Sequence, residues 1–188
     1  MTNLNNNSIK FIFIIFSALS IIISHNQMGY FHWSTILDQD TMITYNSLLV
    51  ASGFEQEYRD HPAYTTFLIN ACIIKFFSLF GIGPLSDINE IIKSENSNEE
   101  LQKLFFLCRQ VNVIFNILLV YFLFKVLKKI NLDNLSALLC CLILIFCGYY
   151  TESLFFLRNE NLSILLFLVS FLFQLKFLNN KKIIFIIF

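Results

Sequence analysis

The chain has 188 residues and a formal net charge of zero; 56% of its residues are hydrophobic and 14% are charged. This composition, with a mean hydropathy of +0.66, excludes an ordinary soluble domain and predicts an all-α, polytopic membrane protein. Without a basic stripe, the charge pattern predicts no nucleic-acid partner. The cysteines lie in apolar segments without C-x-x-C spacing, which indicates small buried side chains rather than disulfides or zinc ligands. They are Cys72, Cys108, Cys140, Cys141 and Cys147.

The first apolar run, IKFIFIIFSALSIIIS, predicts a membrane span over residues 9–25. The amphipathic aromatics Tyr30, Phe31 and Trp33 follow it, as is typical of a membrane–water interface. A cleaved signal peptide is the competing interpretation. Only Lys10 supplies positive charge before the run, and no A-x-A-like site follows, so a retained anchor is favoured.

Residues 26–108 are predicted to form a large outer loop with juxtamembrane helices. Its stretch LDQDTMITYNSLLVASG places Asp38 and Asp40 just before a helix that Gly53 ends. One apolar face of that helix is predicted to contain Met42, Tyr45, Leu49 and Ala51 or Ser52. The helix dipole favours an ionised carboxylate at this end. A simpler interpretation makes Asp40 an N-cap and Asp38 a solvated loop residue.

The following segment, GFEQEYRDHPAY, places Arg59 and His61 directly before Pro62 and an apolar helix over Tyr64–Gly83. An arginine and a histidine at the bilayer surface are suited to hold the phosphate of a lipid-linked substrate. The alternative is a solvated turn in which the proline starts the helix. The segment has no H-E-x-x-H-type metal motif.

Three further apolar blocks predict spans over residues 109–128, 134–150 and 162–178. The terminal IIFIIF, residues 183–188, is too short to cross a bilayer and predicts the start of a fifth span. The chain is therefore interpreted as four spans and an N-terminal fragment of a longer protein.

A polar connector precedes the second span. In it, Asn98 is predicted to cap a helix that has Glu99 and Glu100 in its first turn and runs to Lys129. At 1.5 Å per residue this helix would be about 46 Å long, more than a bilayer needs, so its first turns should project into water.

Charge distribution predicts the orientation. If Tyr64–Gly83 lies on the outer surface and the N-terminus is cytoplasmic, the cytoplasmic segments hold seven of the 13 Lys and Arg residues but one acid, Asp133. A crossing by Tyr64–Gly83 would put KVLKK outside. The positive-inside rule favours the first arrangement, in which Tyr64–Gly83 is an interfacial or re-entrant helix.

A third polar cluster, YYTESLFFLRNENLS, carries Glu152, Arg158 and Glu160 in the short second outer loop. These residues either mark the water boundary or converge on one site with Asp38 and Asp40, which the predicted topology places on the same side.

Taken together, these motifs resemble the N-terminal part of GT-C-fold membrane glycosyltransferases, which include protein O-mannosyltransferases and aminoarabinose lipid A transferases. In that superfamily an acidic D-E-type motif opens the first outer loop, and a juxtamembrane helix ending in S-G, a K-P or H-P motif and a second apolar helix follow. Here DQDTMITYNSLLVASG, DHPAY and FFSLFGIG are similar to these parts in the same order. FLRNENLS stands where the family usually has L-D-P or L-D-S-P.

The resemblance implies a sugar transferase that uses a polyprenyl-phosphate donor and a lipid, glycan or protein acceptor at the outer face of a bacterial inner membrane. It implies Asp38 or Asp40 as the catalytic acid, because D-Q-D replaces D-E. Carboxylate oxygens there would also suit a divalent cation, which some relatives use. Substrate contacts are implied for Arg59, His61, Arg109 and Glu160, the last in place of an aspartate.

The alternative function is a non-enzymatic polytopic protein, such as a transporter portion or an assembly subunit. Transporters place polar residues near the bilayer midplane, within broken helices. In this sequence the predicted spans are nearly free of ionisable residues and the acids cluster outside them. This pattern favours chemistry at the membrane surface.

Overall fold

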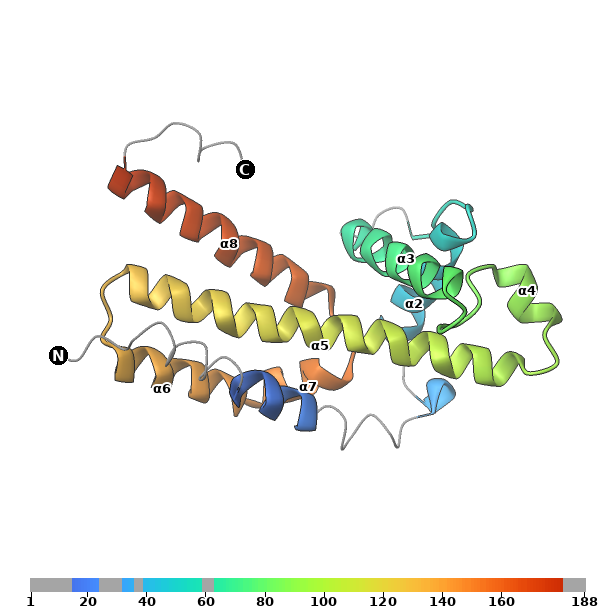
Figure 1. Ribbon diagram of the computed structural model, residues 1–188, viewed down its shortest axis with the longest axis horizontal. Coiled ribbons are helices and arrows are strands. Elements are labelled where there is room, and N and C mark those ends of the chain that lie inside the picture. Colours follow the sequence, from blue (N-terminus) through green and yellow to red (C-terminus); the bar gives the residue numbers. More distant parts are fainter. Residues whose placement is uncertain (1–14, 24–31, 36–38, 59–62, 181–188) are drawn as a thin grey trace. The chain divides into compact units, whose positions relative to one another are not determined.

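The computed structural model describes residues 15–23, 32–35, 39–58 and 63–180, which contain helices and no strand (Figure 1). The predicted all-α class is confirmed for these residues. Contacts divide the chain into two compact units. Unit 1 comprises Met1–His25, Val113–Leu154 and Glu160–Phe188, and unit 2 comprises Asn26–Asn112 and Phe155–Asn159.

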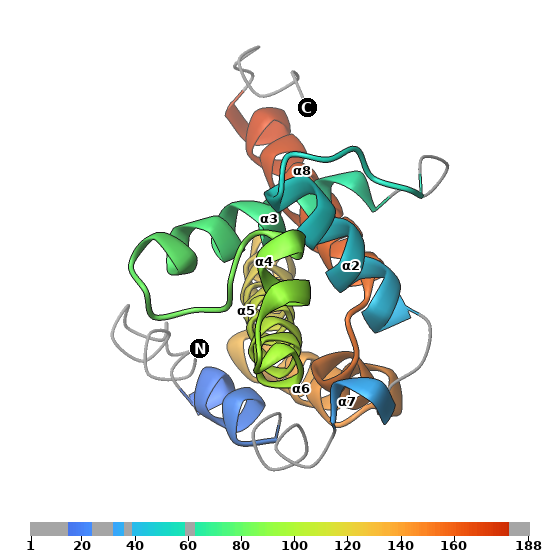
Figure 2. The same cartoon turned by 90° about the vertical axis from the view of Figure 1, so that its right-hand side faces the viewer.

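Unit 2 is built from short helices and the first part of one long helix (Figures 1 and 2). They are η1 (Trp33–Thr35), α2 (Gln39–Ala51), α3 (Tyr64–Leu79), α4 (Ile88–Lys93) and α5 (Ser97–Lys129). Their shared core contains Ile43, Leu48, Ala51, Ala63, Phe67, Ala71, Ile74, Ile91, Leu104, Cys108 and Leu157. Unit 2 therefore has its own hydrophobic core, to which all the helices from α2 to α5 contribute.

The end of α2 is as predicted. Gly53 has a φ of +83°, and the Phe54 N–H donates to the Leu49 carbonyl at 2.9 Å. A glycine adopts this left-handed conformation without the steric cost of a Cβ atom. The turn ends the helix and redirects the chain toward α3.

The prediction that α2 has one buried apolar face is correct only in part. Leu49 and Ala51 are buried, but Met42 and Tyr45 are half-buried. Polar side chains at three other positions are fully buried: Thr44, Asn46 and Ser47. Because α2 is covered on more than one side, periodicity of apolar residues alone could not identify its buried surface.

The helix predicted to follow Pro62 is present as α3. It begins at Tyr64 as predicted and ends at Leu79, four residues earlier than predicted. Gly81 has a φ of +66°, and the chain then turns back so closely that a Cβ atom on Gly83 would lie 2.6 Å from Phe77 Cβ. No side chain fits there without a backbone shift. The GIG sequence thus packs the end of the helix against its own last turn.

Replacing Gly83 by Ala should lower the free energy of unfolding by about 1–3 kcal/mol, because the added methyl group overlaps Phe77. Thermal unfolding in detergent would measure the loss. Gly148→Ala is the matched control, since nothing lies within 4 Å of the new methyl group. Equal unfolding temperatures for the two variants would contradict the close approach at Gly83.

The long helix α5 begins at Ser97, two residues earlier than predicted. Asn98 therefore lies inside it, and the Asn96 carbonyl accepts from the Glu99 and Glu100 N–H groups at 2.9 and 3.1 Å. Glu99 and Glu100 do lie in the first turn. With 33 residues, α5 is about 50 Å long, so the expectation of a helix longer than a bilayer is confirmed.

Unit 1 contains a helix over residues 15–23, the rest of α5, and most of three later helices (Figure 1). The later helices are α6 (Asn134–Ile145), α7 (Gly148–Phe155) and α8 (Asn159–Asn180). Leu119 and Val126 of α5 pack with Leu168 and Leu172 of α8. A hydrogen bond joins two other helices of unit 1: the hydroxyl of Ser20, in the helix over residues 15–23, lies 3.0 Å from the hydroxyl of Tyr150 in α7.

Two helices are long and apolar enough to cross a membrane: α5, and α8 over Asn159–Leu178. They contain the segments 109–128 and 162–178, over which spans were predicted. The span predicted over 134–150 is instead a pair of helices, α6 and α7, bent by 63° where Gly148 follows Phe146 and Cys147. Glycine weakens a helix interior, and Phe146 ends α6. The described residues thus contain two candidate spans, or three if the bent pair counts as one.

The remaining predictions on spans fall partly or wholly outside the described residues. Of the span predicted over 9–25, only residues 15–23 are described, and these are helical. The segment 183–188 lies outside, as do Tyr30 and Phe31. Trp33 is described: its backbone N–H donates to Gln102 Oε1 at 3.0 Å, and its ring lies 6.0 Å from that of Phe105.

The prediction of buried cysteines is correct for two of the five. None is in a disulfide, and Cys108 and Cys141 are buried. Cys72 and Cys140 are exposed. Each of these two cysteines lies off the buried face of its helix, α3 or α6.

Candidate functional site

A buried ion pair joins the acidic segment to the long helix in unit 2. Arg109 Nε donates to Asp40 Oδ2 at 3.2 Å, and the two side chains are 1% and 0% exposed. Asp40 is the second residue of α2, and Arg109 lies 69 residues later on α5. The pair therefore fixes the start of α2 against α5 with a charged hydrogen bond shielded from water.

The same carboxylate also holds a second segment. Asp40 Oδ1 accepts a hydrogen bond from the Leu157 N–H, and Asn112 Nδ2 donates to the Phe156 carbonyl at 2.9 Å. Arg109 and Asn112 are three positions apart on α5, so they share one helix face. Asp40 and Asn112 thus anchor the connection between α7 and α8 through its backbone, and Arg109 holds Asp40.

Burial raises the pKa of the Asp40 carboxyl above its ordinary value. The Leu157 N–H and the Arg109 and Arg158 guanidinium groups lower it and partly offset burial. The interpretation of Asp40 as a simple N-cap is wrong, because its oxygens bond to Arg109 and Leu157. A divalent cation does not fit at Asp40, since it would compete with the guanidinium for the same oxygens.

The other predicted site residues are placed as follows. Asp38, Arg59 and His61 lie outside the described residues. Arg109 is buried against Asp40. Glu160 is exposed in the first turn of α8 and belongs to unit 1. Across the described part of the chain, no three His, Cys, Asp or Glu side chains are grouped as metal ligands would be.

Sequence reasoning missed Asn46, which organises the loop after α2. Its Oδ1 accepts from the Glu57 and Tyr58 N–H groups at 2.9 and 3.3 Å, and its Nδ2 donates to the Met42 carbonyl at 2.8 Å. The Tyr45 hydroxyl donates to Glu57 Oε1 at 2.8 Å, which raises the pKa of Tyr45. The available signal was an asparagine in the middle of a helix, where this residue type is disfavoured.

Replacing Asn46 by Ala should free the backbone of residues 54–58. Two N–H groups lose their acceptor, so we expect a cost of about 1–3 kcal/mol and faster hydrogen exchange at Glu57 and Tyr58. Hydrogen exchange read by mass spectrometry would measure it. Tyr45→Phe is the control, because it removes only the exposed bond to Glu57. Unchanged exchange in Asn46→Ala would contradict the anchoring role.

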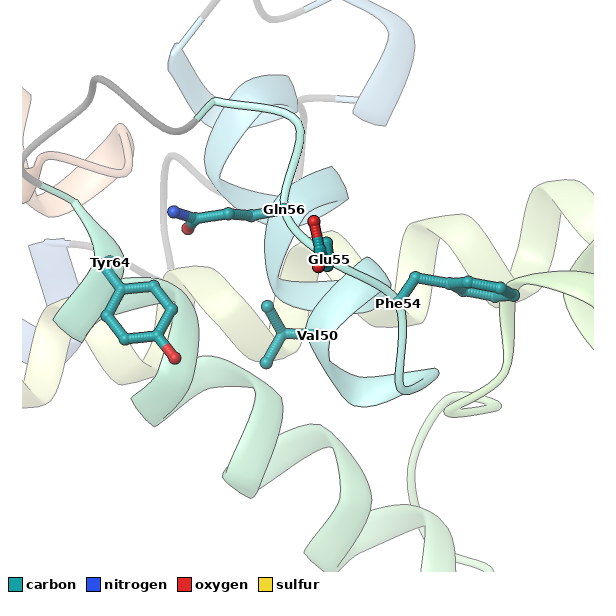
Figure 3. Close-up of a pocket in the computed structure, with 5 residues that line it drawn as sticks. All are labelled: Val50, Phe54, Glu55, Gln56 and Tyr64. Carbon is teal, nitrogen blue, oxygen red and sulfur yellow. The ribbon is translucent and has the colours of Figure 1, made fainter.

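A cavity of about 370 Å³ lies beside this loop, between the end of α2 and the start of α3 (Figure 3). Its lining residues are Val50, Phe54, Glu55, Gln56 and Tyr64. In Figure 3 the Gln56 side chain extends toward the side where Tyr64 lies, whereas Phe54 points the other way. The cavity thus combines a carboxylate, an amide and a phenol with an aliphatic side chain.

Comparison with protein families identifies the chain. The model of one family, dolichyl-phosphate-mannose-protein mannosyltransferase, matches residues 55–186. The chain belongs to that family. Membership of the mannosyltransferase family confirms the recognised superfamily and, with the apolar helices, the broad class of membrane glycosyltransferase.

The mannosyltransferase match covers the cavity-lining residues Glu55, Gln56 and Tyr64, as well as Arg109. It begins after Asp38 and Asp40, so the acidic pair lies outside the matched segment. Comparisons with curated proteins and with solved structures give no significant match.

Proposed function

We propose that this protein transfers a sugar from a polyprenyl-phosphate donor to an acceptor at the outer face of a membrane. The observation that carries the proposal is the mannosyltransferase family match over residues 55–186. The charge distribution supports a cytoplasmic N-terminus, and a bacterial inner membrane is the proposed location. A lipid, a glycan or a protein would serve as the acceptor.

Asp38 is the proposed general base. Asp40 uses its oxygens to bond Arg109 and the Leu157 N–H, so it is better suited to position the start of α2 than to take a proton. In the proposed step an acceptor hydroxyl attacks the anomeric carbon, its proton passes to Asp38, and the bond from that carbon to the donor phosphate oxygen breaks. Asp38 directly precedes α2 in the sequence.

Arg59 and His61 are the proposed partners of the departing lipid phosphate, whose negative charge they would stabilise. Arg109 is less suited to that role, because it is 1% exposed and paired with Asp40. Glu160 remains a proposed substrate contact on the ground that it is an exposed acid in the first turn of α8.

The donor class can be tested with the complete gene product in membrane vesicles. We expect labelled mannose to be transferred from polyprenyl-phosphate mannose, but not from GDP-mannose when lipid-linked sugar synthesis is absent. A membrane-impermeant reagent should label Asp38→Cys from the outer side. Transfer from GDP-mannose alone, or labelling only from the cytoplasmic side, would contradict the proposal.

A further inference from the structure

The basic side chains that the structure describes in unit 1 all lie near the C-terminal ends of its two long helices. They are Lys125, Lys128 and Lys129 of α5 and Lys176 of α8. One described acid, Asp133, lies in the turn that follows α5. The other described acids of unit 1, Glu152 and Glu160, lie in α7 and in the first turn of α8. The lysine end of these helices is therefore strongly positive.

Packing places the lysines of the two helices at a similar level. The helices α5 and α8 run in the same direction, and Val126 and Leu172 belong to one hydrophobic cluster (Figure 1). Lys125 directly precedes Val126, and Lys176 lies one turn after Leu172. The rise from Glu160 to Lys176 along α8 is about 24 Å, so this lysine lies at the opposite end of the candidate span.

Two of the ammonium groups lie over aromatic rings. Lys125 Nζ is 4.5 Å from the centroid of the Tyr121 ring, and Lys176 Nζ is 5.5 Å from that of Phe173. In both pairs the ring precedes the lysine by three or four residues, so the lysine side chain leans back toward the middle of the span. Aromatic rings near the end of a span are typical of the headgroup level of a bilayer. A cation–π contact leaves the ammonium N–H groups able to donate to a phosphate.

The turn after α5 fixes a third ammonium group. Lys128 Nζ donates to the Leu132 carbonyl at 2.8 Å, and Asn131, with a φ of +68°, closes the turn that ends the helix. An ammonium group has three N–H donors, so two remain for another acceptor. The turn thus holds a positive charge in a defined place before any ligand arrives, which lowers the cost of binding.

The acid in this turn leaves most of the positive charge in place. Asp133 caps α6, because its Oδ1 accepts from the Ser136 N–H at 2.8 Å, and Lys128 contributes to lowering its pKa. Among the residues that the structure describes, none of the four lysines forms a salt bridge. One carboxylate against four ammonium groups leaves an excess of positive charge that matches an anionic partner.

Exposed apolar side chains accompany the lysines. Ile130, Leu135 and Leu178 are 45%, 67% and 68% exposed. A soluble anion would use only the ammonium groups, whereas a phospholipid presents a phosphate joined to apolar chains. The combination of ammonium groups, aromatic rings and exposed aliphatic side chains therefore favours a lipid.

We propose that the lysine end of α5 and α8 binds the headgroups of anionic membrane phospholipids, with Lys125, Lys129 and Lys176 supplying positive charge for their phosphates. Groups of roughly four to eight basic residues at the end of a membrane span are typical of such binding. The proposal does not depend on sugar transfer, because these lysines lie at the end of α8 opposite to Glu160, the proposed substrate contact.

Native mass spectrometry tests the preference directly. The complete gene product in detergent is mixed with equal amounts of phosphatidylglycerol and phosphatidylcholine that have the same acyl chains, and the retained lipid is identified by its mass. We expect phosphatidylglycerol to be retained about tenfold more than phosphatidylcholine, since each contributing lysine favours an anionic lipid about fivefold. Equal retention of the two lipids would overturn the proposal.

Paired variants locate the preference on the two helices. Lys129→Gln with Lys176→Gln should lower the ratio of retained phosphatidylglycerol to phosphatidylcholine about tenfold, whereas arginine at both positions should preserve it. Lys75→Gln with Lys93→Gln removes the same charge from exposed sites on α3 and α4 and should leave the ratio unchanged. No fall in the first glutamine pair, or an equal fall in the second, would overturn the proposal.

Competition identifies the source of the phosphate. Soluble glycerol phosphate should not displace phosphatidylglycerol, and polyprenyl phosphate should displace it no better than an equal amount of unlabelled phosphatidylglycerol. Displacement by glycerol phosphate, or stronger displacement by polyprenyl phosphate, would assign the lysine end to a free anion or to the sugar donor and overturn the proposal. A wild type that selects phosphatidylglycerol but transfers no lipid-linked sugar would contradict the proposed function and support this proposal.

Discussion

Replacing Asp40 by Asn is expected to lower the free energy of unfolding by about 3–5 kcal/mol, the usual cost of removing one partner of a buried ion pair. The substitution preserves the shape of the side chain and an oxygen for the Leu157 N–H, but removes the negative charge that the buried Arg109 guanidinium bonds. Thermal unfolding in detergent, with ellipticity as the signal, would measure the loss.

Two comparisons identify the cause of this loss. Removing both charges, with Asp40→Asn and Arg109→Met together, should recover much of the lost stability, because the buried cation is removed together with the anion that it bonds. Glu90→Gln, which removes an exposed acid from the first turn of α4, should leave stability nearly unchanged. A double variant as unstable as Asp40→Asn alone would show that the ion pair is not the origin of the effect.

Replacing Asp38 by Asn is expected to lower kcat for sugar transfer by about 10²–10⁴-fold, the range for loss of a general base. Its unfolding temperature should stay close to that of the wild type, in contrast to Asp40→Asn. Initial rates with polyprenyl-phosphate mannose, normalised to folded protein, would measure the change. Normal turnover would exclude Asp38 as the base.

The Asp40 variants test whether Asp40 itself takes the proton. If Asp40 positions α2 without taking a proton, Asp40→Asn combined with Arg109→Met should regain activity together with stability. A double variant that is stable but as slow as Asp38→Asn would instead assign the proton transfer to Asp40.

Two features of helix ends, the stop of α2 at Gly53 and the acids in the first turn of α5, could be predicted from local sequence. Gly53 after an apolar segment and the acids at the start of α5 act within one turn of the helix that they end or begin, so their effect is visible in a short window. The bend between α6 and α7 was missed because its residues are as apolar as a continuous span. Hydropathy measures composition and does not detect a break in the hydrogen bonding of a helix.

The ion pair between Asp40 and Arg109 could not be predicted from short stretches of sequence, for a different reason. Each residue had been singled out, but for separate roles in catalysis and substrate binding. The residues are 69 positions apart, and only the packing of α2 on α5 brings their charges together. Asn46 was missed because nothing in its neighbourhood shows that a loop 11 residues later needs an acceptor.

The backbone contacts of residues 156 and 157 have a consequence for how this protein can vary. The single peptide group that joins Phe156 to Leu157 is held on both sides, its N–H by Asp40 of α2 and its carbonyl by Asn112 of α5, so the connection has to arrive at a fixed register. Leu157 is also a core residue, so its side chain has to stay apolar. Adding or deleting one residue would misalign both hydrogen bonds, so we expect this loop to tolerate substitutions outside Leu157 and to reject changes of length.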